Sequence, residues 1–282
     1  MINEEDNRRI ILCRLVFGFI LAFLLFRFWL NVTPSHLLQP PLFLLDLDLT
    51  YWLYKFSGIP RFIIYNNTGA VLFDIFLFTT CFLSVLFPLR RVFIITFSPL
   101  FFLYAITYNT FIVHHAHPLT VMMLITIPFW FKKHSTWKIT WEGMRYYICY
   151  IYSMSFIWKL LINNSFFYWN QGIGSVKLNL AEYLYHFPGT TMASFSKYFI
   201  AHPQLLNIGN TFIFLLEGLM VIGFFTKKYD RILMLLPIII HLCTYIFADV
   251  FFIEMLVLIF VFFTKNDAEI IGKKFPFILK HV

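Results

Sequence analysis

The sequence predicts an all-α membrane protein, a polytopic bundle of about eight transmembrane helices with both termini in the cytoplasm. Hydrophobic residues make up 60% of the 282 residues and charged residues only 13%, against roughly 25% charged in a soluble domain. The mean hydropathy is +0.76. The apolar residues form continuous runs and do not alternate, which favours helices over the strands of a membrane barrel. Lipid is therefore the predicted solvent for most of the surface.

Eight apolar runs approach the roughly 20 residues that a helix needs to cross the hydrocarbon core. We predict spans at 10–30, 68–87, 92–112, 117–131, 145–162, 207–225, 231–248 and 250–264. Two longer connections, 31–67 and 163–206, carry Trp, Tyr, Phe and Pro. We expect both to lie in the membrane interface on the outer side. The whole chain, 1–282, is expected to form a single transmembrane domain.

The basic residues predict the orientation of these spans. Fifteen of the 22 Lys and Arg residues lie on the same side as the termini, four lie on the opposite side and three lie within spans. An excess of positive charge marks the cytoplasmic side. These loops account for the net charge of +8, so we expect no nucleic acid partner. The many Phe, Ile, Asn and Lys residues suit a bacterial inner membrane protein, with the opposite side facing the periplasm.

Most polar residues inside the predicted spans lie toward the outer side of the membrane. A charge in the bilayer centre costs a few kcal/mol on insertion scales, so such residues usually face a bundle interior and carry function. Lys159 and His241 are the strongest candidates, because an amine kept neutral by dry surroundings is a competent general base. The outer set consists of Asp74, His114, His115, His117, Lys159, His241, Asp249 and Glu254.

These charged residues also have structural interpretations. Arg14, Arg27 and Lys159 could extend to a lipid head group. Asp74 and Glu217 could be buried partners of Arg14 or Arg27. The three outer histidines could lie in a wet loop. They lack a second cluster of ligands at a fitting spacing, so we expect no metal site.

Three short motifs lie near the outer ends of the predicted spans. The first is residues 109–119, an Asn followed by three closely spaced His residues. The second is residues 155–160, which contain a Lys-Leu pair and are followed by Trp169. The third is residues 241–256, which begin with His and end in Phe-x-x-x-Met-Leu. These motifs resemble the vitamin K-dependent gamma-carboxylase family, whose bacterial relatives are known as the horizontally transferred transmembrane domain (HTTM). The resemblance covers about residues 10–265.

The resemblance implies a quinol-dependent oxygenase or carboxylase, a lyase with its site at the outer leaflet. Lys159 would act as the base toward a reduced quinone, either vitamin K or menaquinone hydroquinone. O2 would convert this quinol into a strong base that removes a substrate proton, and CO2 would then add. His114 or His115 would stabilise an intermediate, with His241 assisting. The residues expected to contact the quinone are Trp158, Trp169, Asp249 and Glu254.

The chain departs from the animal carboxylases after its last predicted span. Those enzymes carry a large luminal region that grips the substrate, whereas a basic segment of about 18 residues with four lysines follows here. We therefore expect a partner protein to replace the missing substrate-binding domain. Alternatively, the core could act on a small molecule.

Two other function classes stay open. One is a non-catalytic membrane subunit that binds lipid, quinone or a partner protein. The other is a proton-coupled transporter that uses Asp74, Glu217 and Glu254, although no internal repeat typical of transporters is visible. A single outer cavity lined by Lys159, His241 and an outer-turn histidine would favour the enzyme. A pairing of Lys159 with a carboxylate in a sealed core would favour the subunit.

Overall fold

The computed structural model describes residues 4–36, 49–111, 117–161, 171–248 and 252–279. Every regular element in these residues is a helix, which confirms the predicted all-α class. The contacts divide the chain into two compact units, which are described separately below. Unit 1 is Met1–Met144 with Phe263–Val282, and unit 2 is Arg145–Phe262.

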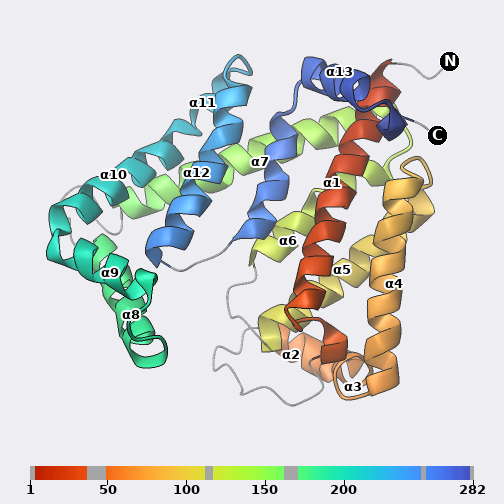
Figure 1. The fold of residues 1–282 in the computed structure, drawn as a ribbon. Coiled ribbons are helices and arrows are strands. Elements are labelled where there is room, and N and C mark those ends of the chain that lie inside the picture. Colours follow the sequence, from red (N-terminus) through yellow and green to blue (C-terminus); the bar gives the residue numbers. More distant parts are fainter. Residues whose placement is uncertain (1–3, 37–48, 112–116, 162–170, 249–251, 280–282) are drawn as a thin grey trace. The chain divides into compact units, whose positions relative to one another are not determined.

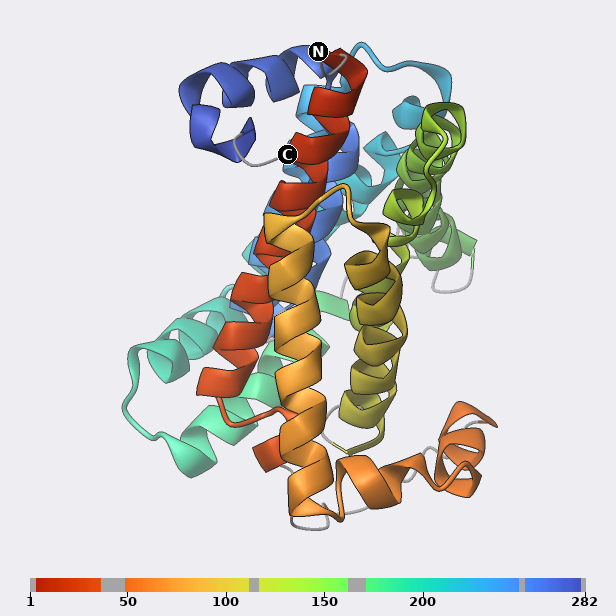
Figure 2. The same ribbon diagram turned by 90° about the vertical axis from the view of Figure 1, so that its right-hand side faces the viewer.

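Unit 1 is built around three long helices that run side by side, α1 (Glu4–Trp29), α4 (Asn67–Leu86) and α5 (Arg91–Phe111) (Figures 1 and 2). A fourth long helix, α7 (His134–Leu161), begins in unit 1 and continues into unit 2. The shorter elements are η1 (Pro34–His36), α2 (Leu49–Phe56), α3 (Ile59–Ile63), α6 (His117–Leu124), η2 (Ile127–Trp130), α13 (Lys265–Lys274) and η4 (Pro276–Leu279).

An aromatic cluster forms the centre of unit 1. The ring of Phe17 meets those of Phe97 and Phe129 edge-on, at centroid distances of 5.5 and 6.1 Å. Phe129 in turn meets Trp141, which stacks on Trp137. All five side chains are almost fully buried. Edge-to-face pairs of this kind add about 0.5–1.5 kcal/mol each beyond the area that they bury, so α1, α5 and α7 share one core.

Side-chain caps define where two helices of unit 1 begin. The Asn66 side chain accepts a hydrogen bond from the backbone N–H of Gly69 at 3.1 Å and starts α4. Thr264 and Asp267 form a reciprocal capping box at the start of α13. A cap satisfies an N–H group that the first turn of a helix leaves unpaired, and its loss costs about 1 kcal/mol.

Unit 2 contains the second part of α7, and short turns join the helices from α8 to α12. Among these helices, α10 lies beside α12, and α8 packs on α9 (Figure 1). The elements are α8 (Gln171–His186), α9 (Thr191–Ala201), α10 (Pro203–Leu219), α11 (Ile222–Phe225), α12 (Asp230–Ala248) and η3 (Ile253–Phe262). A 3₁₀-helix rises about 2 Å per residue. The element η3 is therefore longer than an α-helix with the same number of residues.

Within the described residues, five helices are long and apolar enough to cross a membrane: Asp6–His36, Asn67–Leu86, Arg91–Tyr108, Pro203–Phe225 and Asp230–Phe247. They correspond to five of the eight predicted spans. The other three predicted spans coincide with α6 and η2, with the second part of α7, and with η3. The count of eight crossings and the orientation stay predictions. The two predicted outer connections are themselves largely helical where they are described, and contain η1, α2 and α3, and α8 and α9.

Candidate functional site

Polar side chains of α7 recur on one side of the helix within unit 2. Arg145, Tyr152 and Lys159 are spaced seven residues apart, and Ser155 lies one turn before Lys159. Seven residues are close to two helical turns, so these side chains follow one another along the same face. Each bonds to a residue of α10, α12 or the turn between α11 and α12. We call these four residues and their partners Glu217, Asp230 and His241 the polar seam.

The first end of the seam is a buried ion pair between Arg145 and Asp230. Arg145 Nη2 donates to Asp230 Oδ1 at 2.5 Å, and Nε lies 3.1 and 3.2 Å from the two carboxylate oxygens. The remaining donors reach the backbone carbonyls of Gly223 at 2.7 Å and Thr226 at 3.0 Å. A buried pair stabilises a fold only when its other polar atoms are also satisfied. Here the guanidinium bonds to all three groups, and so it ties the α11–α12 turn to α7.

The middle of the seam joins Tyr152 to His241. Tyr152 Oη and His241 Nε2 are 2.7 Å apart, and either atom can be the donor. Tyr152 is buried, and the His241 ring also meets Phe252 edge-on at 5.6 Å. A polar group in an apolar interior needs such a partner, because leaving it unpaired costs about 1–3 kcal/mol. His241 is therefore held to α7 by Tyr152.

The other end of the seam joins Lys159 to Glu217. Lys159 Nζ donates to both carboxylate oxygens, at 2.6 and 2.7 Å, and Ser155 Oγ donates to Oε2 at 3.2 Å. The two partners differ in exposure, with 38% of the Lys159 side chain accessible and 7% of the Glu217 side chain. The amine thus lies at the surface of unit 2 and the carboxylate behind it.

Local packing brings Glu217 to this position. A Cβ atom on Gly218 would lie 3.0 Å from the ring of Phe156, so the missing side chain lets α10 approach α7 closely. Glu217 also lies in the last turn of α10, and its carbonyl accepts from Met220 N as the helix ends. The negative end of a helix disfavours a carboxylate. The amine of Lys159 offsets this unfavourable position.

Lys159 and His241 bond to different partners within unit 2. Lys159 bonds to Glu217, whereas His241 bonds to Tyr152, seven residues before Lys159 on the same helix. Seven residues correspond to about 10 Å along a helix axis. Lys159 and His241 therefore belong to two separate pairs of the seam. His114 and His115 lie outside the described residues.

The residues expected to contact a quinone differ in their exposure to solvent, and two of them lie outside the described residues. Trp158 is 61% exposed beside Lys159 on α7. Glu254 is buried in the first turn of η3. Trp169 and Asp249 lie outside the described residues. Within the part of the chain that the structure describes, no group of three or more His, Cys, Asp or Glu residues could hold a metal ion.

Asp74 and Glu217 do not pair with an arginine, so that structural interpretation is wrong. Asp74 accepts a hydrogen bond from the backbone N–H of Ser35 at 3.0 Å and holds the turn after α1 against α4. Glu217 pairs with Lys159. Arg14 donates to backbone carbonyls near the end of α4, at 3.1 Å from Val85 O. Backbone groups thus bond to Asp74 and Arg14, and a side chain of the opposite charge bonds to Glu217.

Sequence reasoning missed three members of the seam. Arg145 and Asp230 stand at the ends of predicted spans, where a charge is ordinary, and Tyr152 lies within a predicted span. The seven-residue spacing of Arg145, Tyr152 and Lys159 is the signal that could have found the face. Their partners could not be found in the same way, because they lie on other helices.

Comparisons with models of known protein families, with curated proteins and with solved structures found no match.

Proposed function

We propose that this chain is a membrane enzyme that moves a proton at the Lys159–Glu217 pair during the oxidation of a lipid-soluble quinol. The observation that carries this proposal is the asymmetry of the pair, with a surface amine bonded to both oxygens of a buried carboxylate. Ionisable groups inside a membrane are costly and are functional candidates for that reason. The motif resemblance to the gamma-carboxylase family supplies the substrate class.

The pairing changes the role proposed for Lys159. Lys159 Nζ donates to both oxygens of the Glu217 carboxylate, so the acceptor atoms of the pair belong to Glu217. Glu217 is the proton acceptor of the pair. A quinol hydroxyl group at Lys159 would pass its proton to the Glu217 carboxylate, and the ammonium group would stabilise the resulting quinolate anion. Trp158, the preceding residue of α7, is exposed and offers a flat apolar surface for a quinone ring.

The later steps rest on the resemblance alone. They are the reaction of the quinolate with O2, removal of a proton from a substrate, and addition of CO2. A partner protein would present that substrate, and the membrane, with the site toward the periplasm of a bacterial cell, would supply the quinol. His114, His115, His241 and the remaining expected quinone contacts belong to this part of the proposal.

The test is quinone epoxide formation by the purified protein given menaquinol or vitamin K hydroquinone and O2. We expect epoxide from the wild type and none from Lys159→Met or Glu217→Gln. Lys159→Arg keeps a positive charge but cannot act as a neutral base. Retained activity in this variant would show that residue 159 acts as a cation and not as the base. Lys177→Met, which removes an exposed lysine from α8 of the same unit, is the matched control. No epoxide from folded wild type that binds quinol would refute the enzymatic proposal.

A non-catalytic membrane subunit is the second candidate. The observation that favours it is the same pairing, because three polar contacts along α7 also hold α10 and α12 in place. On this proposal the seam is a structural device, and quinone, lipid or a partner protein binds elsewhere. Quinol binding that is unchanged in Lys159→Met and Glu217→Gln, without epoxide from any variant, would support it.

A further inference from the structure

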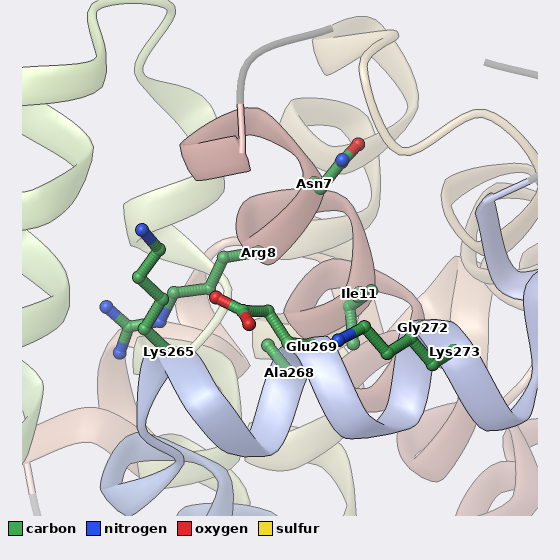
Figure 3. A pocket seen from close by; sticks show the side chains of 8 residues that line it. All are labelled: Asn7, Arg8, Ile11, Lys265, Ala268, Glu269, Gly272 and Lys273. Carbon is green, nitrogen blue, oxygen red and sulfur yellow. The ribbon is translucent and has the colours of Figure 1, made fainter.

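A cavity of about 210 Å³ lies between the start of α1 and the helix α13 in unit 1 (Figure 3). It is unrelated to the polar seam. Polar side chains on its walls come from both helices, and apolar or small residues complete the lining. The lining consists of Asn7, Arg8, Ile11, Lys265, Ala268, Glu269, Gly272 and Lys273.

The charge of this cavity is positive. Three cationic side chains, Arg8, Lys265 and Lys273, line it together with one carboxylate, Glu269. Figure 3 shows Glu269 directed toward Arg8, with Lys273 further along α13. Lys265, Glu269 and Lys273 are spaced four residues apart, so they form one stripe of the helix surface. Among the lining residues, three cations and one carboxylate give a formal charge of +2.

The cationic wall is held in place by hydrogen bonds. Arg8 Nη2 donates to the backbone carbonyl of Phe263 at 2.8 Å, which fixes the guanidinium beside the start of α13. Thr264 and Asp267 then close the capping box of the same helix. Ala268 and Gly272 are buried on the face that packs toward α1. The cavity is therefore a feature of ordered backbone and not of a loose charged surface.

The cavity also lies where a polar helix meets an apolar span. Residue Asp6 begins the most apolar candidate span of the described chain, and Ile11 is within its first two turns. Ile270 on α13 is exposed although most of the helix is polar, and so is Phe275, the C-cap residue that follows the helix. A basic cavity at a membrane border with apolar groups beside it suits a lipid whose head group is anionic and whose chains remain in the bilayer.

We propose that this cavity binds the phosphate group of an anionic phospholipid such as phosphatidylglycerol. Arg8, Lys265 and Lys273 would hold the phosphate oxygens, and Asn7 would bond to the glycerol or to a free oxygen. Glu269 opposes the anion and so limits its affinity. This binding is separate from the quinol proposal, and either can fail alone.

The test is native mass spectrometry of the full chain in detergent at constant salt, with phosphatidylglycerol and phosphatidylcholine of identical acyl chains. We expect the wild type to retain phosphatidylglycerol preferentially. Each basic group near an anionic lipid contributes roughly a fivefold factor, so Lys265→Gln with Lys273→Gln should weaken this binding roughly 25-fold. Glu269→Gln should strengthen it roughly fivefold by the same reasoning.

Lys132→Gln with Lys133→Gln is the matched control, because it removes two exposed cations of unit 1 that do not line the cavity. Equal losses in the control and the cavity variant, or no loss in either, would overturn the proposal. Release of the lipid by millimolar inorganic phosphate would show a phosphate site without lipid selectivity, and would overturn it as well. Melting temperatures of all variants check that each is folded.

Discussion

Arg145 and Asp230 join the first turn of α12 to the middle of α7 through a buried ion pair with a 2.5 Å contact. In the sequence both residues stand near the ends of predicted spans, where a charge is ordinary. In the fold their side chains are only 3% and 7% exposed. The pair, with the carbonyls of Gly223 and Thr226, determines how the α11–α12 turn meets α7.

Breaking this pair should destabilise the protein strongly. Arg145→Ala leaves the Asp230 carboxylate buried without a cation, and the expected loss is about 3–5 kcal/mol of unfolding free energy. The double change Arg145→Met with Asp230→Leu removes both charges and should recover much of this loss. Denaturant unfolding in detergent measures these variants together with the single changes Arg145→Met and Asp230→Leu. A double variant as unstable as the sum of the two single ones would contradict the proposed pairing.

The two residues of the Lys159–Glu217 pair should respond unequally to substitution. Lys159→Met leaves a carboxylate that is 7% exposed, at a cost of about 3–5 kcal/mol. Glu217→Gln leaves a lysine that is 38% exposed and can extend its amine toward the interface, so the cost should be about 1–2 kcal/mol. Thermal unfolding of both variants checks this order. Equal losses would show that the exposure difference has no energetic effect.

Gly69 should not tolerate a side chain, although it lies in the first turn of α4. A Cβ atom there would meet the carbonyl oxygen of Phe62 at 2.1 Å, which is backbone and cannot rotate away. Gly69→Ala should cost about 1–3 kcal/mol. Gly18→Ala in α1 is the control, because no atom lies within 4 Å of its added Cβ. That control should stabilise α1 by up to about 1 kcal/mol. Unfolding curves that shift in the same direction for both would refute this.

Tyr54 should make stability depend on alkaline pH. Its hydroxyl lies 2.5 Å from Thr107 Oγ1, and burial raises its pKa to about 12, against roughly 10 in an unfolded chain. Between these values the unfolded chain ionises and the folded chain does not, so stability present below pH 10 is lost as the pH rises. The total is roughly 3 kcal/mol. Comparing the pH dependence of unfolding in wild type and Tyr54→Phe measures this. If the unfolding free energies of the two proteins change identically with pH, the Tyr54 hydroxyl is exposed to water and not buried.

The helical class and five membrane-length helices were predictable because hydropathy is summed over neighbouring residues. Membrane spans were harder to predict where charged residues interrupt the apolar run or where the run is short. α7 carries charges along its length and η3 is short, so neither meets the criteria of length and apolarity that define a membrane-length helix. Lys159 and His241 were identified as candidates from their rarity in apolar segments. Tyr152 was not, because a tyrosine at a membrane interface is common.

Local properties of the chain thus determined that it forms apolar helices and which charges are unusual. Tertiary structure decided how those charges pair. Glu217 is 58 residues from Lys159, and Asp230 is 85 residues from Arg145. A hydrogen bond depends on separations of about 3 Å, and such a separation arises only after the helices pack. The apolar composition of the chain therefore determines that it lies in lipid. The packing of α7, α10 and α12 determines which partner each buried charge has.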